Sequence, residues 1–219
     1  MSFPRRYRNT LTGRASAAGD ESRSRVLEVA LELFASKGFR GTSIAQIADR
    51  AGLSQSGLLH HFPSKVALLT AALDHRDEID GLLLDTEPGT ALGWEAFDAL
   101  VSLAGRNAAR PDVVGLFVSI SAEAIDPGHP AHAWVIAHYE GVRSWLTDAV
   151  RHGVESGEFD PGTPVEDLVR ETIAVQDGLQ VQWLVSGQSF DLAGALAAFV
   201  EGRRARWGAS TQPVRPARS

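Results

Sequence analysis

The segment GFRGTSIAQIADRAGLSQSGLLHHFPSK, residues 38–65, constrains the fold of this chain more than any other part of it. The two isoleucines of SIAQIA make a short apolar stripe at helical spacing, and Ala-Gly-Leu then ends it in a tight turn. Ser54 can cap a second short helix, which buries Leu58 and Phe62 four residues apart. Two short helices joined by a glycine turn predict a helix-turn-helix, whose second helix can enter a DNA major groove.

The remaining segments also carry helical periodicity, and no segment alternates with period two over a useful length. Proline and glycine turns separate the apolar runs, and the sequence Thr163-Pro164-Val165-Glu166 predicts a capping box at one helix start. The sequence therefore predicts an all-α chain of about nine helices. Besides the two short ones, we expect helices at residues 21–37, 64–84, 92–109, 111–125, 132–156, 164–185 and 192–206.

Three matching runs identify a family resemblance. They are VLEVALELFASKGF at residues 26–39, the following TSIAQIADRAG, and SQSGLLHHFPSKVALL at residues 54–69. Together they resemble the tetracycline-repressor (TetR) family of one-component transcriptional regulators over about the N-terminal third of the chain. The rest is similar in size, helical character and a weak C-terminal pattern.

The resemblance implies a three-helix DNA-binding domain followed by a helical domain for effector binding and dimerisation. We expect a disordered basic arm at residues 1–20, the helix-turn-helix domain at 21–68, the effector domain at 69–207 and a disordered tail at 208–219. The implied function is that of a repressor, which a small, largely apolar effector releases from its operator. The alternative is a helical enzyme or ligand-binding protein without a DNA role.

The charge of the chain is divided unevenly. Residues 1–65 carry ten Lys and Arg against five Asp and Glu, a net of +5, and the remainder carries eleven against twenty-two, a net of −11. A basic N-terminal part followed by an acidic remainder suits a phosphate-binding module joined to another module. An ordinary surface with an inert basic tail has the same charge distribution, and the helix-turn-helix favours the first interpretation.

The first residues of the second short helix reach deepest into a groove. Gln55 can pair with an adenine edge, Ser56 can donate or accept, and Gly57 lets the backbone approach. Thr42 and Ser43 begin the preceding helix, where a hydroxyl and free N–H groups suit a phosphate oxygen. Gln55 is otherwise a solvated first-turn residue, and Ser43 is otherwise a plain helix cap.

The family resemblance assigns further contacts. It implies that Lys65 contacts a phosphate, that His60 faces the backbone or a base, and that His61 packs near the helical hairpin. Leu59 stands where the family often has a phosphate-binding tyrosine, so that hydrogen bond is lost or moves to His60. Either histidine is otherwise a half-buried side chain.

The C-terminal helices carry most of the aromatic residues, which are typical of a core. By resemblance, however, these helices enclose an effector pocket, and such pockets are apolar with a few placed polar groups. The candidate lining residues are Trp94, Phe97, Phe117, Trp134, His138, Gln176, Gln180 and Trp183. Drugs, fatty acids and polyketides all suit such a lining.

One recognition helix reads only a few base pairs, so two DNA-binding domains on a palindromic site are the usual arrangement. The sequence therefore predicts a homodimer. Helices 164–185 and 192–206 are the candidate interface, and by resemblance they make a four-helix bundle with their partners. The second helix carries a stripe of apolar and small residues, Leu192, Ala195, Leu196, Phe199 and Val200. The alternative is that this stripe packs within its own chain.

Several other classes of function have no motif here. We find no G-x-S-x-G, Walker or G-x-G-x-x-G sequence, so we expect no catalytic residues and no cofactor. His129, His132 and His138 lie on different helical faces, and without cysteine or H-E-x-x-H we expect no metal. The absence of cysteine, of a signal peptide and of any run approaching ~18 apolar residues indicates a cytoplasmic protein without a membrane role.

Overall fold

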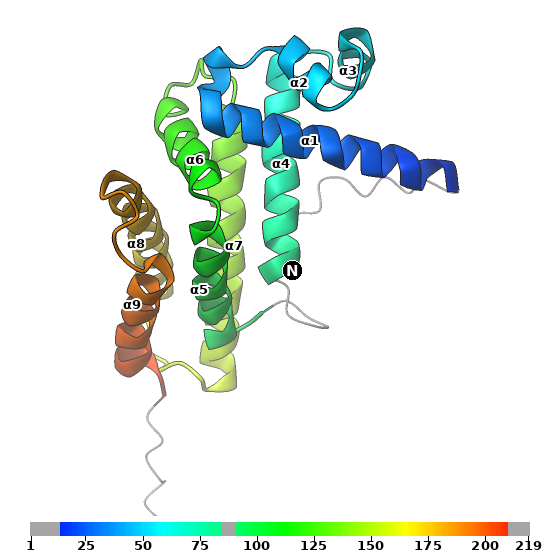
Figure 1. Ribbon diagram of the computed structural model, residues 1–219. Helices are drawn as coiled ribbons and strands as arrows, with labels where there is room; N and C mark the ends of the chain where they lie inside the picture. Colours follow the sequence, from blue (N-terminus) through cyan, green and yellow to red (C-terminus); the bar gives the residue numbers. More distant parts are fainter. Residues whose placement is uncertain (1–13, 85–90, 210–219) are drawn as a thin grey trace, which may run out of the picture.

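The computed structural model describes the backbone of residues 14–84 and 91–209 and the side chains of residues 21–77 and 91–209. Within these residues the chain forms nine helices and one isolated β-bridge, which confirms the predicted all-α fold. The helices are α1 (Arg14–Gly41), α2 (Ile44–Arg50), α3 (Gln55–His61), α4 (Lys65–Leu84), α5 (Trp94–Ala108), α6 (Pro111–Glu123), α7 (His132–Ser156), α8 (Val165–Val185) and α9 (Leu192–Trp207). Figure 1 shows α2 and α3 at one end of the molecule, with α4 running from that end into the body.

Helix α1 begins earlier than the sequence pattern indicated. Its first residue is Arg14, so residues 14–20 are helical rather than part of an arm, while residues 1–13 lie outside the described residues. A helix needs no apolar periodicity to extend beyond its packed turns, because adding a residue costs far less than nucleating the first turn. At the other end Gly38 breaks the helical geometry with a φ of 71°, close to the predicted end.

The helix-turn-helix forms because each short helix has a side-chain cap. Ser43 Oγ accepts a hydrogen bond from the Gln46 N–H at 3.2 Å, while the Gln46 side chain accepts one from the Ser43 N–H at 3.0 Å. Ser54 Oγ accepts one from the Gly57 N–H at 3.0 Å. Between the two helices Gly52 has a φ of 72°, in the left-handed region that favours glycine. These bonds satisfy N–H groups that a helix leaves unpaired at its start.

The buried apolar side chains form two clusters. The first unites α1 to α4 with α6 and the N-terminal part of α7, so the helix-turn-helix unit packs directly against the body. The second cluster joins α5, the C-terminal part of α7, α8 and α9. The division between the clusters falls inside the body, away from the domain boundary that the sequence predicts after residue 68. That boundary stays a prediction.

Helix α8 begins where the sequence indicated, but its capping was predicted wrongly. Pro164 occupies the cap position without a side-chain hydrogen bond. The Thr163 hydroxyl donates instead to the Asp160 carbonyl oxygen at 2.7 Å, across the turn that precedes the helix. Thr163 thus lies one residue before the observed cap position, and its hydroxyl bonds within the preceding turn.

The apolar stripe of α9 lies largely inside its own chain. Leu192, Leu196 and Val200 are buried in the second cluster, where α9 packs against α5. Beyond α9, the Ala209 N–H donates to the Glu158 carbonyl oxygen at 3.0 Å. The first two residues of the predicted tail are therefore paired with the chain, and residues 210–219 lie outside the described residues.

Candidate DNA interface and internal cavity

Helix α3 presents a polar face to solvent at the end of the molecule (Figure 1). Its side chains Gln55, Ser56, His60 and His61 are exposed, while Leu58 is fully buried and anchors the helix to the first cluster. The two histidine rings meet edge to face with centroids 5.7 Å apart. His61 is exposed rather than packed near the hairpin, so that part of the expectation is wrong. Packing of Leu58 below orients the whole polar face outward.

The start of α3 is arranged around the Ser54 hydroxyl. Ser54 Oγ lies 3.1 Å from Ser56 Oγ, so the Ser56 hydroxyl points back toward the cap and must rotate to meet a base. A Cβ added at Gly57 would lie 3.1 Å from Ser54 Oγ, closer than most Cβ contacts. The missing side chain at Gly57 therefore makes room for the capping bond as well as for a close approach of DNA.

Thr42 and Ser43 differ in what they can offer a phosphate. Thr42 is 2% exposed, and its hydroxyl lies 3.0 Å and 2.9 Å from the carbonyl oxygens of Leu33 and Gly38. That hydroxyl faces its own chain, which leaves only the Thr42 backbone for a phosphate. Ser43 is exposed and uses its oxygen as an acceptor, so its O–H proton is still free to donate.

Lys65 has a structural role that the sequence did not indicate. Its ammonium group donates to the carbonyl oxygens of Phe39 at 2.8 Å and Thr42 at 3.0 Å, and lies 4.4 Å from the centre of the Phe39 ring. It thereby joins the start of α4 to the end of α1. An ammonium group has three N–H donors, so one is left for the phosphate that the family resemblance implies.

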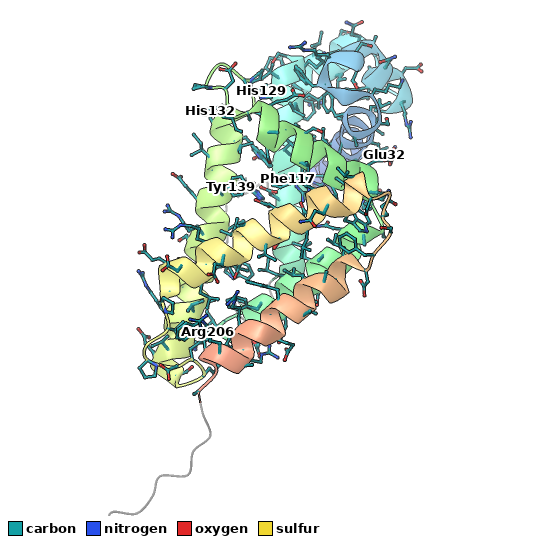
Figure 2. All side chains as sticks on the ribbon, turned by 90° about the vertical axis from the view of Figure 1, so that its left-hand side faces the viewer. Glu32, Phe117, His129, His132, Tyr139 and Arg206 are labelled. Atoms are coloured by element: carbon teal, nitrogen blue, oxygen red, sulfur yellow. The ribbon has the colours of Figure 1, made fainter. Side chains whose placement is uncertain are left out.

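A second candidate site is a cavity in the body, with a volume of about 50 Å³. It lies between α4, α5, α6, α7 and α8. Figure 2 shows Phe117 and Tyr139, which line it from α6 and α7, and the two rings have centroids 6.4 Å apart. The lining residues are Arg76, Asp77, Leu100, Leu103, Asn107, Phe117, His138, Tyr139, Val142, Trp145, Ile173, Gln176, Asp177 and Gln180.

Two hydrogen-bonded pairs tie helices together across this cavity. His138 Nδ1 on α7 lies 2.8 Å from Asp77 Oδ2 on α4. The Tyr139 hydroxyl on α7 donates to Asp177 Oδ2 on α8 at 2.7 Å. Burial raises the pKa of Asp177, and burial together with the neighbouring Asp177 carboxylate raises the pKa of Tyr139. Charged forms of these groups are therefore less favoured than in water.

Some acidic and amide side chains of the lining have a polar atom without a hydrogen-bond partner among the residues that the structure describes. These atoms are Asp77 Oδ1, Asn107 Nδ2 and Gln180 Oε1. Asn107 and Gln180 are 8% and 3% exposed, so water around the molecule does not satisfy them. Native proteins leave few such atoms, and a cavity beside them is where a bound molecule can satisfy them.

The cavity contains part of the set expected from the sequence. Phe117, His138, Gln176 and Gln180 line it, whereas Trp94, Phe97, Trp134 and Trp183 do not. Trp94 stacks on Phe159 at 4.0 Å and Phe97 packs beside it, in the second cluster. Trp134 stacks behind His138 at 5.2 Å, and Trp183 is buried in the second cluster. These four aromatic side chains therefore pack in the core and do not line the cavity.

The charged residues of the lining were not among those predicted from the sequence. Arg76, Asp77 and Asp177 are ordinary charged residues on amphipathic helices, and a single sequence gives no signal that they turn inward. Asp177 is three residues before Gln180, on the same side of α8, but this spacing does not by itself say that this side faces a cavity.

The described residues give no metal-binding group of three or more suitable side chains, and none of their helices is long and apolar enough to cross a bilayer. Figure 2 shows His129 and His132 at the turn between α6 and α7. His132 Nδ1 lies 2.7 Å from the Ala124 carbonyl oxygen, and the Ala131 N–H donates to His129 Nδ1 at 3.2 Å. Both rings are engaged in the geometry of this turn, away from His138 in the cavity.

Two family models match separate parts of the chain. Residues 26–72 match the family described as bacterial regulatory proteins of the tetR family, and residues 98–202 match the C-terminal domain of BetI-type transcriptional repressors. The HTH-type transcriptional repressor KstR2 of Mycobacterium tuberculosis is 27% identical over 183 residues, covering 80% of this chain and 86% of that protein.

Solved structures share the fold over most of the chain. A TetR transcriptional regulator from Chloroflexus aurantiacus superposes with a TM-score of 0.73 at 24% identity, covering 89% of this chain and 100% of that one. A protein from Saccharomonospora viridis, crystallised in complex with choline, superposes with a TM-score of 0.70 at 22% identity, covering 87% and 100%.

Proposed function

The chain belongs to the TetR family of DNA-binding transcriptional regulators, and on that basis we propose that it is a repressor, which binds a palindromic operator as a homodimer and leaves it when a small molecule enters the cavity. The observation that carries this proposal is the continuity of α4, which starts beside the DNA-reading unit and supplies Arg76 and Asp77 to the cavity. One helix thus belongs to both sites.

Recognition of DNA rests on α3 and its surroundings. Gln55 and Ser56 at its start offer groups that match base edges, and His60 and His61 at its end offer ring N–H groups. Ser43 and Lys65 each have a donor left for a phosphate, which fixes the register of the protein on the duplex. Because few side chains are available to read bases, the shape of the DNA contributes to specificity.

The way in which an effector would release the protein from its operator follows from the size of the cavity. A cavity of about 50 Å³ holds a few water molecules, whereas ligand pockets measure roughly 300–1,000 Å³. A ligand of ordinary size must therefore push the lining helices apart, and it binds best to a conformation in which they are apart. Displacement of α4 changes the position of the helix-turn-helix unit, so the ligand favours the state that does not match the operator.

The homodimer uses the two helices expected, α8 and α9, but the exposed apolar residues come from α8 rather than from the predicted stripe of α9. Because the stripe of α9 is mostly buried in its own chain, α8 supplies the exposed apolar residues, with Val181 and Val185 43% and 84% exposed. Ala174 and Gly178 continue the same side of α8 and are small enough for close approach. Figure 2 shows α8 and α9 side by side on one face of the molecule, and we propose that this face pairs with its copy.

Selection of duplexes from a random pool tests the DNA-binding part of the proposal. We expect a two-fold symmetric consensus with half-sites one helical turn apart, and an affinity that falls steeply with salt. The Gln55→Ala variant should give a consensus altered at one base pair in each half-site. Failure to enrich any sequence, or binding that is insensitive to salt, would contradict the proposal.

A further inference from the structure

The cavity brings together two carboxyl groups and an unpartnered amide oxygen, beside one unpartnered donor, Asn107 Nδ2. Asp77 uses Oδ2 for the bond with His138, and its Oδ1 is buried without a partner among the described residues. Asp177 uses Oδ2 to accept from the Tyr139 hydroxyl. The two carboxylates face one formal cation of the lining, Arg76, since His138 is the only other basic residue there. The lining thus contains two carboxyl groups and one guanidinium.

Gln180 adds an acceptor that the chain itself does not use. The side chain is 3% exposed, and Oε1 has no partner among the described residues. It lies one turn of α8 beyond Asp177, so the two acceptors share one side of the helix. A buried carbonyl oxygen without a donor is costly, and a donor brought into the cavity would remove that cost.

Aromatic side chains form much of the remaining wall. Phe117, Tyr139 and Trp145 line the cavity, and aromatic faces attract cations. The Arg76 guanidinium already lies 4.8 Å from the centre of the Phe117 ring, which shows that this wall accommodates a cation. Leu100 and Leu103 supply purely apolar surface beside the rings. The cavity therefore combines an acidic, acceptor-rich side with an apolar one.

We propose that the effector is a primary amine in its ammonium form, carried on a small apolar body. Its N–H groups donate to Asp177 and Gln180, and its apolar body contacts the aromatic wall. Its positive charge offsets the negative charge that Arg76 alone does not balance. A donor is required because the unpaired Gln180 carbonyl oxygen needs an N–H or O–H, which a tetraalkylammonium group lacks. The positive charge is what distinguishes the amine from an alcohol at the two carboxylates. This inference rests on the proposed function, since it names the chemistry of the molecule that enters the same cavity. Burial raises the pKa of Asp177, and a cation beside it would lower that pKa again.

Matched probes that differ only in the head group test the proposal. An amine, an alcohol and a carboxylate are compared on both an n-butyl and a 2-phenylethyl body, by thermal shift at millimolar concentration and by calorimetry on the full chain. We expect the amine of at least one body to raise Tm and to bind at least about tenfold more tightly than its alcohol, with no stabilisation by the carboxylate. Equal binding of the alcohol or the carboxylate, or no binding by either amine, would overturn the proposal.

Substitutions in the cavity lining test whether the amine binds there. Asp177→Asn and Gln180→Leu should each weaken amine binding about tenfold or more. The control is Asp167→Asn, which removes an exposed carboxylate on the same helix that pairs with Arg170 at 2.8 Å outside the cavity. Amine affinity should be unchanged in this control. If Asp167→Asn weakens binding as much as Asp177→Asn does, the amine binds through the general negative charge of the body and the proposal is wrong.

Operator binding, measured with and without the amine, separates this inference from the proposed function. If the amine binds but the operator affinity stays the same, the release mechanism fails while the ligand chemistry stands. If the operator is bound and a neutral or anionic compound releases it, the regulatory function stands while the ligand chemistry fails.

Discussion

At the scale of single residues, the structure changes the interpretation of Lys65. The family resemblance implies a phosphate contact, and the ammonium group also holds the end of α1 through two carbonyl oxygens. A residue with both roles affects stability and DNA affinity together. Gln55 differs because it is exposed and its side chain supports no other element, so its substitution should act on DNA alone.

We therefore expect Lys65→Ala to lower the free energy of unfolding by about 1–3 kcal/mol, because two carbonyl oxygens lose a charged donor. The same change should reduce the slope of log affinity against log salt by about one unit if a phosphate contact is lost. Gln55→Ala should leave stability unchanged and alter preference at one base pair by roughly 1–3 kcal/mol. Chemical denaturation and salt titrations measure these quantities. An unchanged salt slope in Lys65→Ala would assign the residue a structural role alone.

Asp177 gives a prediction about pH. Its raised pKa means that the folded chain binds this proton more tightly than the unfolded chain, in which the carboxyl group titrates near its ordinary pKa of 3.8. Stability is therefore lost as the pH rises from that value through the folded pKa. Asp177→Asn removes the ionisation and should melt at a higher temperature than the unsubstituted chain at neutral pH, with the difference shrinking as the pH falls toward about 4.

The control for this prediction is again Asp167→Asn, whose carboxylate is exposed. Its melting temperature should follow that of the unsubstituted chain across the same pH series. A destabilisation by Asp177→Asn that is equal at all pH values would show that the Tyr139 hydrogen bond, and not the buried charge, decides the stability at this position.

At the scale of elements, the short helix α3 depends on its cap more than a long helix would. It has seven residues, and helices of this length are not stable alone in water. The Ser54 bond to the Gly57 N–H and the burial of Leu58 hold it in place. The polar face therefore keeps its orientation through one hydrogen bond and one anchor in the core.

Ser54→Ala should lower the free energy of unfolding by about 1 kcal/mol, the usual effect of removing a cap, and shift Tm by roughly 2–4 °C. It should also weaken operator binding, because α3 frays at the end that reads bases. Ser56→Ala is the matched control, since its hydroxyl contacts only the Ser54 hydroxyl among the described residues. That change should alter stability by about 0.5 kcal/mol or less. Equal effects of the two substitutions on stability would argue against the cap.

At the scale of the whole molecule, the position of the cavity determines which parts of the protein an entering molecule would move apart. The cavity lies where the first cluster, which includes the helix-turn-helix unit, adjoins the second cluster of α5, α8 and α9. Phe117 belongs to the first cluster and also lines the cavity. A molecule that enlarges the cavity therefore separates the DNA-reading half of the protein from the half that we expect to pair with a second copy.

Replacement of Val181 by Asp tests the pairing of copies. Because both copies of a symmetric dimer carry the substitution, the interface contains two new aspartates. We therefore expect the dimer dissociation constant to rise at least about tenfold, with a parallel loss of operator affinity. Sedimentation over a concentration series measures the first effect. Ile125→Asp is the control, because Ile125 is 79% exposed but lies at the turn after α6, away from α8. A monomeric unsubstituted chain at micromolar concentration, or a Val181→Asp chain that still dimerises normally, would refute the interface.

The sequence by itself determined the local features of this protein. The cap at Ser54, the glycine turn at Gly52 and the anchor at Leu58 are properties of neighbouring residues, so a helix-turn-helix could be predicted before any contact was known. Periodicity gave the number of helices for the same reason, because a helix buries one side of its own length whatever its partner is. The matching family runs cover this local part of the chain.

Tertiary structure alone decided which side chains meet. Trp94 and Trp183 have the same apolar character as Phe117, yet only Phe117 lines the cavity, because the packing of distant helices fixes which rings enclose space. Asp77 and Asp177 are a hundred residues apart on helices with ordinary polar sides, and their inward position depends on how α4, α7 and α8 pack. Burial and charge balance arise from contacts between elements far apart along the chain, and a pattern read along one helix holds no information about them.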